Sequence, residues 1–126
     1  MISSRIKWAV LGSIAALMTA LIGQAQNPAN RGKELFEKRC GGCHAQDRDK
    51  EGPRLGGIYG RAAASVASFH YSDALQKSKI VWSEETLDKW LTDPEKLVPD
   101  TDMNFHVENP DERREIISFL KQSSGK

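Results

Sequence analysis

The sequence has few of the residues that build metal sites from side chains alone. Its 126 residues include two cysteines and three histidines. A structural zinc site needs four ligands, usually arranged as two closely spaced pairs of Cys or His. Cys40 and Cys43 form one such pair, but His70 and His106 lie far apart in the chain. The sequence therefore argues against a zinc site.

The chain also lacks the patterns that several other functional classes require. Its formal net charge is +1 and it has no basic patch or stripe, which argues against nucleic-acid binding. The glycine-rich stretch 52–61 has no Gly-x-Gly-x-x-Gly spacing after a strand, so a phosphate-binding loop is not indicated. There is no convincing strand pattern, internal repeat or low-complexity segment. These absences favour a small all-α protein.

No apolar run is as long as a typical membrane span. The longest apolar run, Trp8–Gly23, carries no charge and has 16 residues, and a spanning helix needs roughly 20. Basic residues precede this run and small residues flank Gln24, which is the layout of a secretory signal peptide. An uncleaved membrane anchor is the alternative; cleavage would leave no stable membrane insertion. The sequence predicts a signal peptide over residues 1–25, export to the periplasm, and a single domain over residues 26–126.

The stretch Cys-Gly-Gly-Cys-His at residues 40–44 is the most informative motif of the chain. Cys-x-x-Cys-His is typical of c-type haem attachment. Cys40 and Cys43 could each form a thioether with a vinyl group of one macrocycle, and His44 follows Cys40 at i+4, so its ring points the same way and reaches the iron. A redox dithiol is a weaker interpretation because no βαβ pattern surrounds the motif. A structural disulfide without haem is another alternative.

Candidates for the second axial ligand of the iron are few. Met103 is the only methionine outside the predicted signal peptide, and it sits in an irregular stretch rather than on an apolar helix face, where methionine usually fills a core. His106 and His70 are the alternatives. His/Met ligation raises the reduction potential and fills both axial positions, so O₂ and peroxide find no open site. This ligand pair indicates electron transfer rather than an enzyme.

Apolar spacing and capping residues predict three main helices joined by long loops. Residues 95–105 show no helical period. A further short helix is expected after Ser72. The three main helices are expected over residues 31–43 with Asn30 as the N-cap, from Ser83 to Asp93-Pro94, and from Pro110 to about residue 123 with Asn109 as the N-cap.

Taken together, these features resemble class I cytochrome c of the mitochondrial and bacterial c2 type. The resemblance covers about residues 31–122 and implies a small all-α cytochrome c fold, with three main helices, short helices and long loops wrapped around one covalent haem c. Besides the Cys-x-x-Cys-His motif, it is carried by the Gly32-to-Phe36 spacing, Gly52-Pro53-Arg54-Leu55, Gly60-Arg61, Phe69–Ala74, Trp82, Asp93-Pro94 and Pro99–Phe105.

The resemblance also implies roles for particular residues. Cys40 and Cys43 would hold the haem covalently. The carbonyl of Pro53 would accept a hydrogen bond from His44, which fixes the tautomer and basicity of the ring. The residues that it implicates in binding the haem propionates are Arg61, Tyr71 and Trp82, the last through its indole N–H.

The chain departs from the family pattern at four places. The loop after His44 is about three residues shorter than in the mitochondrial form. Trp90 stands where the family has a tyrosine that hydrogen-bonds the methionine sulfur, and Leu75 replaces an asparagine of the same network. Asp100 and Asp102 flank Met103, and Glu95 stands where a lysine is usual. These acids predict a partner whose docking face is neutral or basic.

The expected function is that of a monomeric, periplasmic electron carrier with redox protein partners and no catalytic activity. One alternative is a fixed haem c subunit of a larger periplasmic dehydrogenase or oxidase. Another is a small haem peroxidase or sensor, which would require a labile Met103 ligand.

Overall fold

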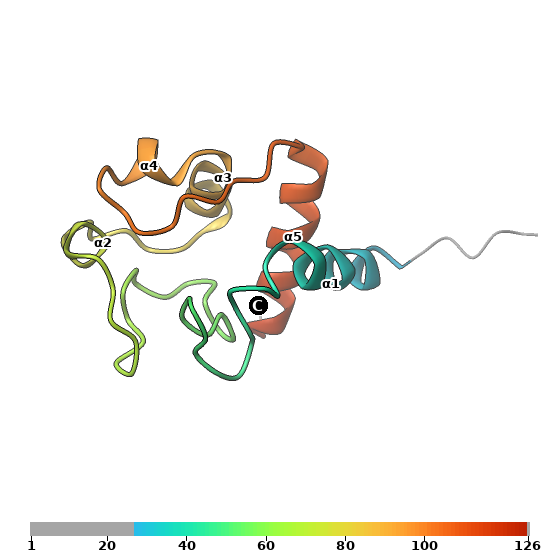
Figure 1. Ribbon diagram of the computed structural model, residues 1–126. Helices are drawn as coiled ribbons and strands as arrows, with labels where there is room; N and C mark the ends of the chain where they lie inside the picture. Colours follow the sequence, from blue (N-terminus) through green and yellow to red (C-terminus); the bar gives the residue numbers. More distant parts are fainter. Residues whose placement is uncertain (1–26, 126) are drawn as a thin grey trace, which may run out of the picture.

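The computed structural model describes residues 27–125, so the predicted signal peptide lies outside the described residues. This part of the chain contains three longer and two short helices and no strand (Figure 1). None of these helices is both long and apolar enough to cross a membrane. The helices are α1 (Pro28–Arg39), α2 (Asp73–Lys77), α3 (Glu84–Thr92), α4 (Pro94–Leu97) and α5 (Pro110–Ser123).

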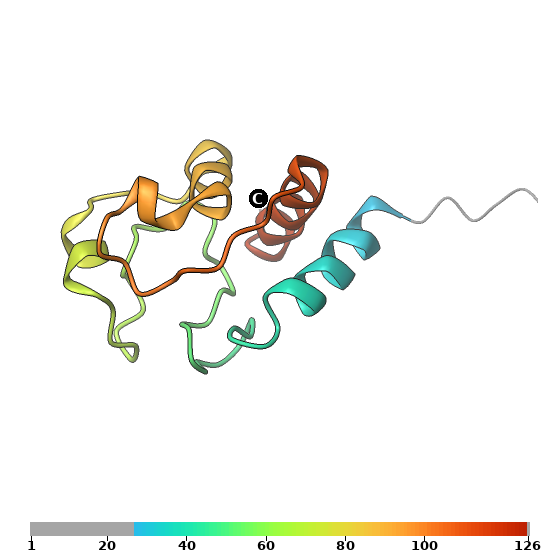
Figure 2. The same ribbon diagram turned by 45° about the horizontal axis from the view of Figure 1, so that its top comes forward.

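The first and last helices cross and form one side of the molecule (Figures 1 and 2). At the crossing, Gly32 of α1 faces α5 so closely that a Cβ atom would lie 2.5 Å from the carbonyl oxygen of Glu115. The rings of Phe36 and Phe119 pack next to it with centroids 5.3 Å apart. Ile116 is fully buried here. The small residue thus allows the backbones of α1 and α5 to meet and lets the two helices pack closely.

Helix α1 begins earlier than the sequence pattern predicts. It starts at Pro28 with Asn27 as its N-cap, whereas the expected cap, Asn30, lies inside the helix. The side chain of Asn27 accepts a hydrogen bond from the amide of Ala29 at 3.1 Å. Proline suits the first helical position because its fixed φ matches the helix and it has no N–H to satisfy. Asn27 and Pro28 therefore set the start of the helix, and Asn30 does not act as its cap.

Helix α1 also ends earlier than expected, at Arg39 instead of Cys43. Two glycines follow Cys40, and glycine is a poor helix former. The backbone nevertheless makes one more turn, because the amide of His44 donates to the carbonyl of Cys40 at 2.8 Å. Cys40 and His44 therefore keep the i, i+4 relation that the motif requires.

The remaining helices begin at side-chain caps. Ser83 caps α3 in a reciprocal capping box with Thr86, Ser72 caps α2, and Asn109 caps α5, all as predicted. Asp93 ends α3 and caps α4, a single turn within the stretch where no helix was expected. Four residues are too few to show a helical period, so the sequence pattern could not reveal it.

Two long loop regions connect the two sides of the molecule. Between α1 and α3 the chain runs as loops around α2, held by an isolated antiparallel bridge between Ala62 and Val81. The amide of Trp82 donates to the carbonyl of Arg61 at 2.8 Å beside this bridge. Between α4 and α5 the chain returns as a second loop, 98–109, below α3 and α4 in Figure 1. These loops bring the predicted site residues to one cavity.

Candidate functional site

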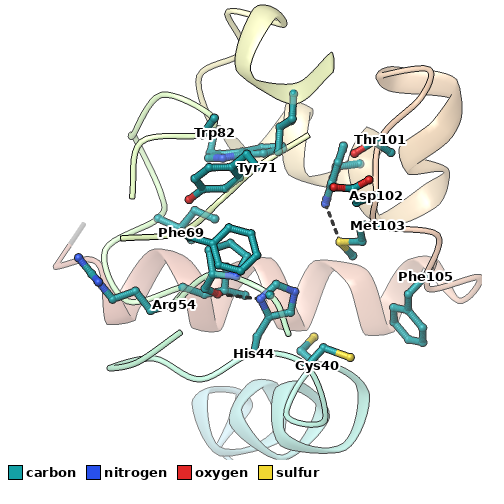
Figure 3. A pocket seen from close by; sticks show the side chains of 18 of the residues that line it. Cys40, His44, Arg54, Phe69, Tyr71, Trp82, Thr101, Asp102, Met103 and Phe105 are labelled. Carbon is teal, nitrogen blue, oxygen red and sulfur yellow. Dashed lines mark hydrogen bonds between the residues drawn. The ribbon is translucent and has the colours of Figure 1, made fainter. Parts of the chain in front are cut away.

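A cavity of about 540 Å³ lies between the α1–α5 pair, α3 and the two loop regions. Its walls are mainly apolar and include Leu55, Ile58, Leu75 and Leu91. Figure 3 shows side chains from several elements that point into this space. All eight site residues predicted from the sequence line the cavity: Cys40, Cys43, His44, Pro53, Arg61, Tyr71, Trp82 and Met103.

The imidazole of His44 is fixed by one hydrogen bond. Its Nδ1 atom lies 2.8 Å from the carbonyl oxygen of Pro53. Because a carbonyl can only accept, Nδ1 must carry the proton, which leaves Nε2 with a free lone pair. Burial lowers the pKa of His44, although the hydrogen bond to Pro53 partly opposes this effect. Burial therefore favours the neutral ring, the form in which imidazole binds a metal.

The position of this ring depends on a glycine that the sequence analysis did not select. A Cβ atom on Gly52 would overlap three atoms of the His44 ring. The residue at position 52 must therefore lack a side chain if the ring is to stay where it donates to Pro53. The sequence motif around Pro53 contains this glycine, but nothing in the sequence alone indicates what it faces.

Cys40 and Cys43 form no disulfide with each other, and both line the cavity. Cys40 is partly buried, and burial raises the pKa of its thiol to about 11, while Arg39 opposes the shift. Cys43 is exposed, with its Sγ atom 3.6 Å from a carboxylate oxygen of Glu51. Cys40, Cys43 and His44 therefore line the same cavity, as attachment of one macrocycle requires.

Met103 reaches the cavity from a different wall than His44 does (Figure 3). Its sulfur accepts a hydrogen bond from the indole N–H of Trp90 at an Nε1–Sδ distance of 3.2 Å. His70 also lines the cavity but has an exposed side chain. His106 does not line it, and its ring lies 3.7 Å from Glu108 instead. Of the predicted alternatives, the geometry thus favours Met103.

A polar group on the cavity wall lacks an acceptor within the described residues. Arg61 donates from Nη1 to the carbonyl of Gly56 at 3.0 Å, but its buried Nε has no partner there. The hydroxyl of Tyr71 accepts from the amide of Val66 at 3.2 Å, so its own proton is still available to donate. Buried donors of this kind require an acceptor. A carboxylate that enters the cavity would supply one.

These groups together fit a haem. The donor set comprises two thiols, an imidazole nitrogen and a thioether sulfur around an apolar cavity, and the unpaired Arg61 donor suits a propionate. Cys40 and Cys43 would attach the macrocycle, and His44 and Met103 would be able to bind its iron. The residues present therefore match both the chemistry and the polarity of that cofactor.

Asp49 and Ser68 form a small hydrogen-bonded network with Arg54, which lines the cavity. One carboxylate oxygen of Asp49 accepts from the amide of Arg54 at 2.9 Å, and the other accepts from the hydroxyl of Ser68 at 2.6 Å. The guanidinium of Arg54 donates to the same hydroxyl at 3.0 Å. The Ser68 bond is the main reason that the pKa of Asp49 is lowered. No sequence pattern indicates this network, because its members are distant and individually ordinary.

Comparisons with known proteins agree with this geometry. The family model described as Cytochrome c matches residues 29–124. Cytochrome c of Cochliobolus lunatus is 38% identical over 107 residues, which cover 82% of this chain and 99% of that protein. Cytochrome c of Euglena viridis is 42% identical over 96 residues, which cover 74% of this chain and 94% of that protein. Among solved structures, cytochrome cH from Methylobacterium extorquens matches with a TM-score of 0.70 and 35% identity, covering 75% of this chain and 97% of its own.

Proposed function

This chain belongs to the cytochrome c family, and from that premise we propose that it is a soluble, exported electron carrier whose haem iron is bound by His44 and Met103. This ligand assignment rests on the observation that His44 and Met103 line the same cavity. His44 presents its free Nε2 there, and Met103 presents its sulfur from another wall. Nitrogen and thioether ligands of this kind are used for electron transfer by c-type cytochromes.

Family membership settles the coarser features. The resemblance to class I cytochrome c and the small all-α cytochrome c fold are confirmed. The cofactor of the family is one covalently attached haem c, and the chain is therefore a monohaem electron-transfer cytochrome. When bound, the haem supplies one-electron exchange between Fe(II) and Fe(III).

Contacts of the remaining cavity residues support a role for each of them. Cys40 and Cys43 would form the two thioether links that retain the cofactor through redox cycles. Arg61, whose buried Nε has no partner within the described residues, would donate to a propionate. Tyr71 has a hydroxyl proton to offer the same group. The indole of Trp82, which is 5% exposed, closes that wall of the cavity.

With two protein side chains on the iron, small oxidants find no open coordination site. The protein is then an electron carrier and not a peroxidase, an oxygenase or a gas sensor. Met103 is the ligand on which this distinction depends, because a thioether binds iron more weakly than an imidazole does. The hydrogen bond from Trp90 holds the Met103 sulfur at the cavity wall.

The optical spectrum tests the ligand pair. Protein expressed with its own leader in a host that attaches haem c should show a c-type spectrum, with the weak near-infrared band of Fe(III)–thioether ligation. We expect Met103→Ala to lose this band and to lower the reduction potential, because the soft thioether favours Fe(II). His106→Ala, which alters a side chain outside the cavity, is the matched control and should keep both properties.

Two results would overturn this assignment. The first is a near-infrared band that survives in Met103→Ala. The second is rapid carbon monoxide binding by the reduced wild-type protein at neutral pH, since that requires an open or labile site and would indicate a sensor or a peroxidase.

Export and the oligomeric state are further parts of the proposal. Residues 1–25 have the layout of a signal peptide, and their removal leaves a periplasmic, monomeric carrier with redox proteins as partners. N-terminal sequencing and sedimentation of the exported protein test this part. A mature chain that starts at Gln26 and sediments as a monomer supports it, whereas an intact leader would indicate a membrane-tethered form.

A further inference from the structure

We propose that Arg113 is a positioning residue for the iron ligand: its side chain fastens the end of the Met103 loop, residues 98–109, to α3 and so limits how often Met103 leaves the iron. Figure 1 shows this loop passing α3 before it reaches α5. The inference rests on the proposed ligand role of Met103. It goes beyond that role because it assigns control over the residence time of the ligand to a side chain on α5 that does not line the cavity.

Arg113 makes three hydrogen bonds to two separate parts of the chain. Its Nη1 atom donates to the carbonyl oxygens of Val107 and Glu108, both at 2.9 Å. Its Nε atom donates to a carboxylate oxygen of Asp88 on α3 at 2.8 Å. One planar guanidinium therefore joins the end of the loop to a neighbouring helix. A lysine could not reproduce this arrangement, because its ammonium group lacks the fixed fork of donors.

The surroundings of this guanidinium strengthen its hydrogen bonds. The side chain of Arg113 is 11% exposed, so little water competes for its donors. Hydrogen bonds from a charged donor are roughly twice as strong as those between neutral groups. A charged group in such a position is costly to leave unpaired, so the guanidinium and its three acceptors stabilise one another's positions. The end of the loop is therefore held firmly between α3 and α5.

Val107 is held through both of its backbone polar groups. Its amide donates to the carbonyl of Leu91 on α3 at 2.7 Å, and its carbonyl accepts from Arg113. Its side chain is buried. The other end of the ligand segment is less well protected from water. There, Asp100 donates its amide to the carboxylate of Glu95 at 3.0 Å, and both residues are exposed. The end at α5 is thus the stronger anchor.

The segment between these anchors has almost no hydrogen bonds of its own. In the part of the chain that the structure describes, no backbone amide or carbonyl of residues 101–106 is hydrogen-bonded, and the one side-chain hydrogen bond there joins Trp90 to the Met103 sulfur. Segments with few protected hydrogen bonds open at a low cost in free energy. How far this segment opens therefore depends on what holds its ends. Loss of the anchor at Val107 would give it the freedom that departure of the sulfur requires.

Two variants of the holoprotein test the role of Arg113. Arg113→Lys keeps the positive charge but loses the fork of donors, whereas Asp88→Asn removes the charged acceptor on α3 and leaves the bonds to the loop carbonyls. Added imidazole displaces Met103 from the ferric iron at a rate that follows how often the sulfur leaves. We expect this rate to rise roughly fivefold or more in Arg113→Lys, as loss of one hydrogen bond would produce, and to rise less in Asp88→Asn. Arg114→Lys is the matched control, because Arg114 is the next residue of α5 and, within the described residues, pairs only with Asp111.

A second measurement separates positioning of the ligand from a general effect on stability. Denaturant titration can follow both the near-infrared band, which reports the bond from the Met103 sulfur to iron, and the helical circular dichroism, which reports the whole fold. We expect Arg113→Lys to lose the near-infrared band at a lower denaturant concentration than the helical signal, with a wider separation of the two midpoints than in wild type. A purely structural role would lower both midpoints equally and leave the imidazole rate under native conditions unchanged.

Imidazole rates of Arg113→Lys and Asp88→Asn that equal the rate of Arg114→Lys would overturn the proposal. If Arg113→Lys does not fold, the rate of Asp88→Asn alone is the test, because the side chain of Asp88 is 50% exposed and its replacement changes no buried group. A rate equal to that of the control then contradicts the inference. These outcomes are distinct from failure of the ligand assignment, which would appear as a near-infrared band that survives in Met103→Ala.

Discussion

At the scale of single residues, the site depends as much on absent atoms as on donor groups. Gly52 illustrates this, because its missing side chain leaves the space in which His44 lies while it donates to Pro53. The position of the His44 ring depends on one hydrogen bond and on the absence of a side chain at residue 52. It is therefore sensitive to a single added carbon, since closely packed interiors do not accommodate one without strain.

We therefore expect Gly52→Ala to displace the His44 ring. The Pro53 hydrogen bond should lengthen, the reduction potential should change, and the free energy of unfolding should fall by about 1–3 kcal/mol, as for other overpacked sites. Denaturant titration and voltammetry measure these effects. Gly42→Ala lies in the same segment but has nothing within 4 Å of the added carbon, so it is the matched control. Equal unfolding midpoints for the two variants would contradict the steric argument.

How far the sequence predicts the site also depends on individual residues. Cys40, Cys43 and His44 follow from local spacing, because one turn of backbone brings them together. Met103 can be predicted as a ligand because it is the only methionine outside the predicted signal peptide. The bond from Trp90 to Met103 follows neither from local spacing nor from rarity, and only the family resemblance, which aligns Trp90 with a tyrosine that bonds the sulfur, points to this position. It depends on how α3 lies against the following loop, which no periodicity specifies.

At the scale of elements, the sequence predicts helices through their capping residues. It does not predict a helix of a single turn or a contact between residues that are distant in the chain. Ser83 and Asn109 identify α3 and α5 because a cap acts on the next few residues. Helix α4 is too short to show a period. The hydrogen bond between Asp49 and Ser68 cannot be predicted from the sequence, because the two residues are 19 positions apart and lie in different loops.

This loop contact should contribute to stability in a pH-dependent way. The Ser68 hydrogen bond and the Arg54 amide lower the pKa of Asp49 below its ordinary value of 3.8. A depressed carboxyl pKa means that the stabilisation is fully present above the ordinary pKa and is lost as the pH falls through the lower folded-state value. We expect Asp49→Asn to unfold at lower denaturant concentration than wild type at pH 7. This difference should shrink below about pH 4.

Unfolding midpoints measured between pH 3 and pH 7 test this expectation. Asp47→Asn is the matched control, because Asp47 lies in the same loop and, within residues 27–125, pairs only with the neighbouring, exposed Arg48. A difference between wild type and Asp49→Asn that stays constant down to pH 3 would show that the carboxylate charge is not what holds the two loops together.

At the scale of the whole molecule, charge around the cavity mouth bears on the choice of partner. Phe105 lines the cavity and is 44% exposed, which marks this side as open to solvent. On the Met103 loop, Asp100 and Asp102 are exposed. On the α1 side, Arg39 pairs with Glu112 at 2.8 Å, which offsets its charge. A cationic reactant should therefore approach the Met103 loop more readily than an anionic one.

Small redox reagents test this charge preference without knowledge of the natural partner. We expect the rate constant for reaction with a cationic metal complex to fall as salt rises, because surface charges are screened beyond about 10 Å at 0.1 M ionic strength. The double variant Asp100→Asn/Asp102→Asn should react more slowly with this complex at low salt and should lose most of the salt dependence. Asp47→Asn, outside the cavity lining, should retain wild-type behaviour. Suppose instead that an anionic complex of similar reduction potential reacted faster at low salt than at high salt. The surface around the cavity mouth would then carry an effective positive charge. A partner with a neutral or basic face would then no longer be expected.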